Sequence, residues 1–341
     1  MSNWMIYGAN GYTGELIARE AVRRGLRPIL AGRNAERIES LARELGCESR
    51  VFDLDRPELS GVSLVLHCAG PFIHTSKPMV KACLAAGAHY LDITGEIGVF
   101  ESILRRDAEA KEKGVTLLPG VGFDVVPTDC LAAMLHAEMP DATELWLAFS
   151  MRNGGVSRGT LKTMIEGAGL GGAIRRNGKI EVVPQLFDVR SIPFASGPRL
   201  TMTIPWGDVS TAFHTTGIPN IRVYSSQSPR AIRRMRLMRP FLPLLRIGVL
   251  RRLAQRYAER TTGPSAETRA TARIELWGRV VNASGKELTK TMSVAEGYQF
   301  TVLSSLEAVH RVLAAPKPGA FTPAKFFGPG FVKTIPGTEI T

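Results

Sequence analysis

Short apolar runs alternate with amphipathic stretches over about the first 125 residues of the chain. The apolar runs predict strands at residues 4–7, 28–32, 50–52, 62–68, 89–93 and 115–118. The stretches between them predict helices at residues 14–25, 35–45, 77–86 and 99–113. The run at 62–68 is largely apolar, which is typical of a strand buried on both faces. Alternating strands and helices predict a parallel sheet with right-handed crossovers.

The pattern changes near Pro127. A helix is expected at residues 128–138, followed by strands at 145–151, 200–204, 221–224, 268–281 and 287–294. The last two strands flank the turn residues Asn282-Ala-Ser-Gly285, which predict an antiparallel hairpin. A further helix is expected at 297–314, before a tail rich in Pro and Gly. This part of the chain therefore predicts an α+β domain on a mostly antiparallel sheet.

Three glycines lie between the first strand and the first helix, in Gly8-Ala-Asn-Gly11-Tyr-Thr-Gly14. Gly8 allows a tight turn, Gly11 allows a pyrophosphate to approach the backbone, and Gly14 allows the helix to pack closely on the sheet. The helix N-terminus then offers free N–H groups to phosphates. The motif alone is weak, but its place in a βαβ unit is the one that a Rossmann dinucleotide-binding domain requires. The cofactor-contacting residues expected here are Gly8, Asn10, Gly11, Tyr12, Thr13 and Gly14.

The end of the second strand indicates which dinucleotide binds. NAD enzymes usually carry Asp or Glu there, to bind the ribose 2′-OH. This chain has Arg33 and Asn34 instead, with Arg37 one helical turn further on. A guanidinium can bind a 2′-phosphate with two hydrogen bonds, so we expect NADP, although a solvated arginine at a strand end is the simpler alternative. The loops after the third and fourth strands add Asp53, Ala69, Gly70, Pro71 and Phe72 to the expected cofactor site.

At this point the sequence resembles the saccharopine dehydrogenase-like oxidoreductases. The resemblance rests on the glycine loop with Ala31-Gly-Arg33, then Cys68-Ala-Gly-Pro-Phe72, Tyr90-Leu-Asp-Ile-Thr-Gly-Glu96 and Gly120-Val-Gly-Phe-Asp124, in the family's order. Looser similarity around 207–219 resembles the branch that includes trans-acting enoyl reductases. The family implies an α/β fold: a Rossmann parallel sheet with an inserted α+β domain. The expected domains are 1–126 for the nucleotide, 127–296 for substrate binding and dimerisation, and 297–341 as a helix and tail returning to the Rossmann domain.

The catalytic residues are harder to predict, because hydride transfer is the cofactor's chemistry and the protein must only orient the substrate and supply a proton. The loops and the second domain offer Tyr90, Lys77 and His214 as weak candidates, beside His74, Cys68 and Asp124. None belongs to a Tyr-xxx-Lys pair, and a structural role is the preferred interpretation of each. Asp92 and Glu96, at one strand end, could bind substrate or cap a helix. Asp208 and Thr211 share a face with His214 if that segment is helical, and there they could line the substrate side or form a satisfied surface cluster.

Charge adds a second feature, since the formal net charge is +12 and ten arginines lie within residues 230–260. Large aliphatic residues alternate with these arginines, and Pro240 and Pro243 predict a break between two helices. An amphipathic element on an anionic membrane would have this composition. A helical pair that packs on its own domain or on a dimer partner fits equally well. No base-reading motif accompanies the charge, so nucleic acid is not an expected partner.

The remaining composition narrows the class of protein. The four cysteines have no CxxC spacing and no accompanying His cluster, so we expect no metal site. No apolar run is long enough to span a bilayer and no signal peptide is recognised, so we expect a cytoplasmic homodimer, peripheral to membranes at most. The predicted function is an NADP-dependent oxidoreductase that acts on the enoyl or imine group of a small or lipid-like substrate. The alternative is a non-catalytic NADP-binding protein that acts at a membrane or lipid surface.

Overall fold

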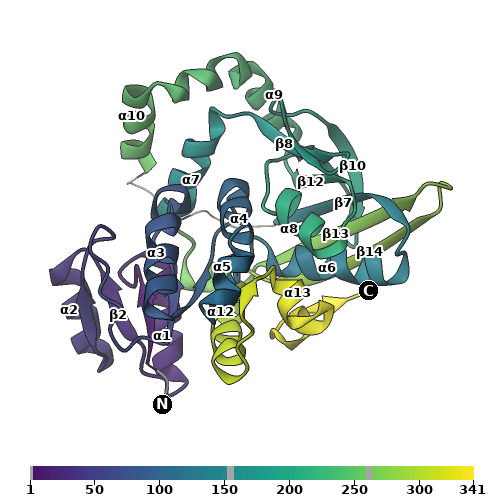
Figure 1. Ribbon diagram of the computed structural model, residues 1–341. Helices are drawn as coiled ribbons and strands as arrows, with labels where there is room; N and C mark the ends of the chain where they lie inside the picture. Colours follow the sequence, from purple (N-terminus) through teal and green to yellow (C-terminus); the bar gives the residue numbers. More distant parts are fainter. Residues whose placement is uncertain (1–2, 152–156, 259–262) are drawn as a thin grey trace. The chain divides into compact units, whose positions relative to one another are not determined.

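The computed structural model describes residues 3–151, 157–258 and 263–341 (Figure 1). By their contacts, the residues divide into two compact units. The first comprises Met1–Asp124 and Tyr298–Phe326, and the second comprises Val125–Gly297 and Phe327–Thr341. Each unit is built around its own sheet.

The first unit contains a seven-stranded sheet in the order β15-β6-β5-β4-β1-β2-β3. All of its pairings are parallel, which confirms the prediction. The central strands are wholly buried, as their continuous apolar runs require. The strands are β1 (Trp4–Tyr7), β2 (Ile29–Gly32), β3 (Ser49–Val51), β4 (Leu64–His67), β5 (His89–Asp92), β6 (Thr116–Leu118) and β15 (Gly319–Ala320).

The helices of this unit depart from expectation at two places. Helix α3 begins at Phe72, not at residue 77, because the carboxylate of Glu96 accepts hydrogen bonds from its first amide groups. The single helix expected at 99–113 is two helices, α4 and α5, which are separated at Arg105 and Arg106. The sequence has no Gly or Pro at this position that would have marked the break. The helices are α1 (Tyr12–Arg23), α2 (Ala35–Leu45), α3 (Phe72–Ala86), α4 (Ile97–Leu104), α5 (Asp107–Glu112) and α12 (Gly297–Ala314).

The second unit has a nine-stranded sheet in the order β10-β11-β12-β7-β13-β14-β16, with β8 and β9 joined to it through β12. Only β12 and β7 pair in parallel, so the sheet is mostly antiparallel as predicted, and the hairpin of β13 and β14 is confirmed. The strands are β7 (Ala142–Met151), β8 (Gly172–Arg176), β9 (Lys179–Val183), β10 (Val189–Phe194), β11 (Gly197–Thr203), β12 (Asn220–Ser226), β13 (Arg273–Asn282), β14 (Glu287–Ala295) and β16 (Glu339–Ile340).

Helices α6 and α8 pack on one face of this second sheet, where Leu131 and Leu135 of α6 lie against Gly278. The strand expected at 268–281 begins only at Arg273, because the hydroxyl of Ser265 caps a short helix, α11, by accepting from the amide of Thr268. The helices are α6 (Val126–Glu138), α7 (Arg158–Ala168), α8 (Asp208–Thr216), α9 (Pro229–Met238), the 3₁₀ helix Arg239–Arg246, α10 (Gly248–Ala258) and α11 (Ala266–Thr271).

The C-terminal tail is shared between the units. Strand β15 adds to the first sheet beside β6, as expected for a returning chain. From Phe327 onward the tail lies in the second unit, where β16 pairs with β14 and the side chains of Phe331 and Val332 are buried. The expected return of the whole of 297–341 to the first domain therefore differs from the structure after Phe326. Helix α13 (Pro323–Phe327) lies at this point of change.

Candidate cofactor site

The glycine loop lies where the strand order of the first sheet reverses. Strands β1 and β4 are neighbours, and the chain proceeds from them toward opposite edges of the sheet. The loops after these strands touch: a side chain at Gly8 would lie 2.8 Å from the amide nitrogen of Ala69. In parallel sheets, ligands bind beyond the carboxyl ends of the strands at such a switch point.

Two of the three loop glycines are required by the protein's own backbone. Gly8 has a φ of +87°, which L side chains rarely adopt. A Cβ at Gly14 would lie 2.3 Å from the carbonyl oxygen of Gly8, so helix α1 could not pack there with any larger residue. Gly11 differs, because its φ is −83° and its Cβ would meet only the oxygen of Gly8, at 3.2 Å. The protein's own packing therefore requires glycine at positions 8 and 14, and it gives less reason for glycine at position 11.

Helix α1 presents its N-terminus at this loop. Gly11 is its N-cap residue and supplies no side-chain hydrogen bond. The acidic residue of the first turn, Glu15, pairs with Arg19 at 2.9 Å. Tyr12 and Thr13 open the helix, and the Tyr12 ring meets Tyr298 edge-on at a centroid distance of 4.9 Å. Uncapped N–H groups at a helix N-terminus attract phosphate, which suits a pyrophosphate at this position.

Arg33 and Asn34 are the first two residues after β2, as expected. Asn34 caps helix α2, because its side-chain oxygen accepts from the amide of Arg37 at 2.9 Å. The side chains of Arg33 and Arg37 are exposed, and neither forms an ion pair with a residue that the structure describes. Burial raises the pKa of Tyr7 to about 12; the charge of Asp53 raises it further and that of Arg33 lowers it, so both charges lie near this hydroxyl. Asn10 also belongs to this edge, since a Cβ at Gly32 would approach its Oδ1 to 3.0 Å.

The loop after β4 is held by hydrogen bonds that the sequence did not reveal. The Thr75 hydroxyl donates to the carbonyl oxygen of Ala69 at 2.6 Å, and Nε2 of the buried His67 lies 3.0 Å from the same hydroxyl. Burial lowers the pKa of His67 to about 3, so the ring is neutral. Gly70 and Pro71 complete the loop and are joined by a cis peptide bond. Only the helical spacing of Thr75 from Pro71 could have hinted at this bracing role.

Comparison with known proteins agrees with this geometry. Residues 4–118 match the family model described as the saccharopine dehydrogenase NADP binding domain. This part of the chain belongs to that family. A trans-acting enoyl reductase of Mycobacterium bovis is 30% identical over 183 residues, which cover 48% of this chain and 43% of that protein. The human saccharopine dehydrogenase-like oxidoreductase is 26% identical over 236 residues, covering 59% of this chain and 52% of that protein.

The chain spans about half the length of the curated relatives it matches. Among solved structures, apo saccharopine dehydrogenase (L-Glu forming) from Saccharomyces cerevisiae aligns over 100% of both chains, with a TM-score of 0.64 and 10% identity. At that identity the likeness shows the fold alone. Residues 4–118 thus match the NAD(P)-binding domain of the saccharopine dehydrogenase family, and the chain has the fold of the yeast enzyme.

Two aromatic residues expected at the site are turned away from it. The Tyr90 side chain is fully buried and its hydroxyl donates to Oδ2 of Asp92 at 2.7 Å, while burial raises its pKa well above the ordinary value. Such a hydroxyl keeps its proton, which argues against Tyr90 as the proton donor. The Phe72 ring packs in the core, edge-on to His67 at 5.5 Å, so it is not free to stack on a nicotinamide.

Three carboxylates gather at the ends of β5 and β6 in this saccharopine dehydrogenase-like domain. Asp92 is a structural link, because it accepts from the amides of Thr94 and Gly120 as well as from Tyr90; burial raises its pKa to about 6. Glu96 caps α3 through Phe72 and Ile73, at 2.7 and 2.8 Å, so the capping alternative holds. Asp124 packs against Gly95, where a Cβ would lie 2.6 Å from its Oδ2. Burial, and next the charge of Glu96, raise the pKa of Asp124 to about 7.

The other candidate donors are scattered. Lys77 and His74 are exposed on α3, and burial raises the pKa of the Cys68 thiol far above its ordinary value. In the second unit, residues 208–216 do form a helix, α8, but Asp208 and Thr211 are buried, and Asp208 accepts from Thr128 of α6 at 2.8 Å. Both side chains are buried, so they do not form a surface cluster. His214 is half-buried beside Phe213. Within the described residues, no three His, Cys, Asp or Glu side chains are arranged to hold a metal ion.

Proposed function

We propose that the chain is an NADP-dependent oxidoreductase. The observation that carries the choice of cofactor is the end of β2, where exposed Arg33 stands in place of the acidic residue that NAD enzymes use. Arg37 lies on the first turn of α2 and faces the same solvent. Two guanidiniums without ion-pair partners among the described residues suit a 2′-phosphate dianion, which a carboxylate would repel.

In this proposal the cofactor's phosphates bind at Gly8–Gly11 and the N-terminus of α1, and its nicotinamide lies beside the loop of residues 69–71. Bound NADP(H) supplies the hydride. The protein holds the loop in place through Thr75 and Glu96 and must provide a proton. Asp124 is the carboxyl group at this edge whose pKa, about 7, suits proton exchange at neutral pH. We therefore prefer Asp124 to Tyr90, Lys77 and His214 as the proton-transferring residue.

For the substrate we propose a compound with a polarised double bond, either an enoyl group or an imine. Support comes from the names of relatives, which include a trans-acting enoyl reductase and saccharopine dehydrogenase-like oxidoreductases. Both reactions need the same two steps, hydride delivery to carbon and proton delivery to the neighbouring atom. The second candidate function is a non-catalytic NADP-binding protein at a lipid surface, which the exposed apolar side chains between residues 237 and 253 favour.

NADPH consumption separates the two functions. The full chain is incubated with NADPH and a panel of 2-enoyl thioesters and cyclic imines, and absorbance of the reduced nicotinamide is followed. We expect oxidation with at least one class, and loss of most of the rate in Asp124→Asn at unchanged NADPH affinity. Glu36→Gln, which removes an exposed carboxylate on α2, is the matched control. Tight NADPH binding without turnover across the panel would favour the non-catalytic function.

A further inference from the structure

Residues 229–258 form an arginine segment, which comprises α9, the 3₁₀ helix Arg239–Arg246 and α10. Pro240 and Pro243 lie in the 3₁₀ helix, where the expected break between two helices occurs. Residues 259 and 260, the end of the stretch identified from the sequence, lie outside the described residues. The segment contains no acidic residue.

The described arginines of this segment have no acidic partner among the residues that the structure describes. Seven of their side chains are described and exposed: Arg230, Arg233, Arg234, Arg236, Arg239, Arg252 and Arg256. None of them forms an ion pair with a described residue of the chain. Elsewhere the exposed arginines of this protein often do so, as Arg19, Arg23 and Arg176 show. Among the described residues, these seven arginines therefore have no acidic side chain that neutralises them.

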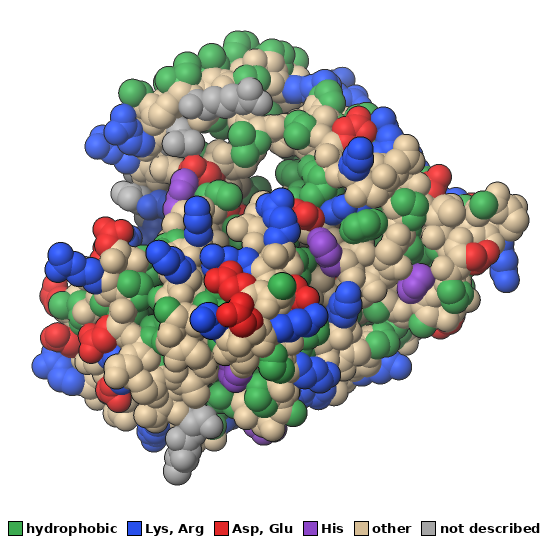
Figure 2. Space-filling view, viewed as in Figure 1, with side chains coloured by type: hydrophobic (Ala, Val, Ile, Leu, Met, Phe, Trp, Pro, Cys, Tyr) green, Lys and Arg blue, Asp and Glu red, His purple; other side chains and the backbone are tan. Residues whose placement is uncertain are grey.

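Large apolar side chains of the same segment are also exposed. Leu237 is 71% exposed, Phe241 59% and Leu253 55%. The others are Met238, Leu244, Ile247, Val249 and Leu250. Figure 2 shows hydrophobic side chains in a row along the upper outer edge of the molecule, with basic side chains near both ends of the row. A soluble surface does not usually keep so many large apolar groups together unless something covers them.

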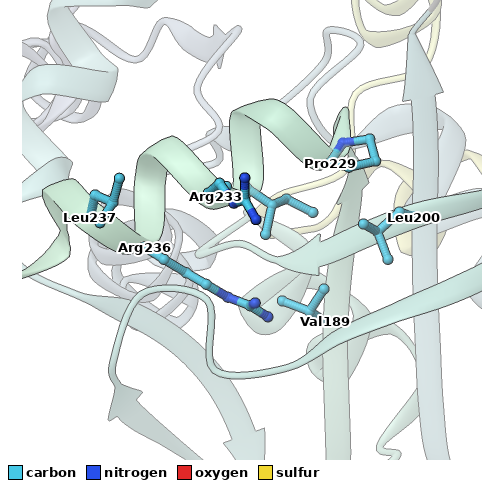
Figure 3. A pocket seen from close by; sticks show the side chains of 7 residues that line it. Val189, Leu200, Pro229, Arg233, Arg236 and Leu237 are labelled. Atoms are coloured by element: carbon cyan, nitrogen blue, oxygen red, sulfur yellow. The ribbon is translucent and has the colours of Figure 1, made fainter.

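A groove lies between α9 and the strands β10 and β11, with a volume of about 450 Å³ (Figure 3). Val189, Leu200 and Ile232 give it an apolar lining, and Arg233 and Arg236 lie along it. Leu237, the most exposed of the apolar side chains of the segment, stands at one end. Apolar lining beside two guanidiniums matches a molecule with an acyl chain and an anionic head.

We infer that the arginine segment docks on the surface of an anionic phospholipid bilayer. Guanidiniums bind phosphate and carboxylate headgroups, and the neighbouring aliphatic and aromatic side chains enter the boundary with the acyl chains. The proline-broken helices suit a segment that lies in the interface, and none of the described helices is long and apolar enough to cross a membrane. A nucleic acid would match the charge but not the exposed apolar groups. The inference goes beyond the oxidoreductase proposal and does not depend on it.

Vesicle co-sedimentation of the full chain tests this inference. Phosphatidylcholine vesicles with and without phosphatidylserine are compared at low and high salt. We expect binding only to the phosphatidylserine vesicles, and release at high salt because the attraction of basic groups to an anionic surface is screened. No sedimentation with phosphatidylserine vesicles at low salt would overturn the inference.

Two sets of variants show whether the segment is responsible. Arg233→Gln with Arg236→Gln and Arg239→Gln should weaken binding at least about tenfold, whereas the control Arg43→Gln with Lys81→Gln and Arg105→Gln, an equal change in charge, should leave it within about twofold. The double variant Leu237→Ser with Phe241→Ser should also weaken vesicle binding about tenfold. Its control is Leu26→Ser with Val182→Ser, which replaces two exposed apolar side chains outside the segment. NADPH affinity and far-UV circular dichroism check that every variant is folded.

Equal losses in segment and control variants would overturn the inference, since binding would then follow net charge alone. The competing occupant is a second copy of the chain. If the segment variants convert a dimer to a monomer in light scattering, and the unmodified chain does not bind vesicles, the segment is an interface between copies and the membrane inference is wrong.

Discussion

The two units bury their sheets in different ways. The central strands of the first sheet are covered on both faces, and the groups that would contact a cofactor follow directly after strand ends. The second sheet packs one face on α6 and α8, and its other face carries Trp146 among arginines. In the first unit, the candidate cofactor site is formed by short loops that the parallel sheet brings to one edge. In the second unit, residues from distant parts of the sequence meet through strand pairing, most of it antiparallel.

The arginine-bearing face of the second sheet shows the consequence. The guanidiniums of Arg190 and Arg279 lie 4.1 and 4.7 Å from the ring centre of Trp146, and Asp188 pairs with Arg190 at 2.5 Å. Arg190, Trp146 and Arg279 come from β10, β7 and β13 and are far apart in the sequence. No local motif could have predicted the cluster, because strands that are distant in the sequence bring its members together.

Replacing one glycine in each unit should give the largest difference between the units, measured as the loss of unfolding free energy. Gly14→Ala brings a Cβ against the backbone oxygen of Gly8 at 2.3 Å, so the helix must move, and we expect a loss of unfolding free energy of about 3 kcal/mol or more. Gly278→Ala places a Cβ 2.7 Å from the side chain of Leu135, which can rotate, so a loss of about 1–2 kcal/mol is expected. Urea unfolding measures both. Equal losses would contradict the distinction between backbone and side-chain crowding.

Gly11→Val separates cofactor binding from folding within the same loop. The added side chain lacks a strong internal clash but occupies the path of the pyrophosphate, so affinity for either dinucleotide should fall at least about 100-fold. The variant should unfold at nearly the same urea concentration as the unmodified chain. Fluorescence titration measures the affinity. Normal NADPH binding by the folded variant would show that the loop is not the phosphate site.

Asp124 gives a smaller effect, on pH dependence. Its pKa is raised from 3.8 to about 7, so the folded protein holds a proton that the unfolded chain has lost. The associated stability is complete below about pH 4 and is lost as the pH rises through about 7. Asp124→Asn stays neutral, so it should flatten this decline and stabilise the fold by about 1–3 kcal/mol near pH 8.

Glu96→Gln is the control for the cause of this pH dependence. Removing the neighbouring negative charge should lower the pKa of Asp124 and move the decline in stability to lower pH. Asp92, whose pKa is raised to about 6, leaves a residual decline of the same sign in both variants. An unchanged pH profile in Asp124→Asn would mean that Asp124 is ionised in the folded protein.

The parts that could be predicted are those decided by local sequence. Helix α2 was predicted at both ends, since Asn34 caps its start and Gly46, with a φ of +63°, ends it. The helix α7 and the strands β8, β9 and β10 were missed. Strand β9 has no clear alternation of buried and exposed residues, and β10 contains Pro193, so neither follows the pattern of a half-buried strand.

The directions of side chains were the least predictable part of the site. Tyr90 and Phe72 lie close to the expected loops in sequence, yet both point into the core. The binding partners of Glu96 and Thr75 depend on how α3 starts, which the periodicity placed too late in the sequence. The positions of the glycine loop and Arg33 could be predicted, because their proposed roles depend on where the backbone lies at strand ends and not on the direction of a buried side chain.

The role of Arg33 is the central claim, and comparative titration of the full chain with NADPH and NADH tests it most directly. We predict that NADPH binds more tightly and that Arg33→Ala weakens NADPH by about 1.5–3 kcal/mol, the range for a charge-assisted hydrogen bond, with NADH nearly unchanged. Arg43→Ala, at the far end of α2, is the matched control and should alter neither affinity. Equal affinity of the unmodified chain for both dinucleotides, or an equal loss of both in Arg33→Ala, would contradict the account.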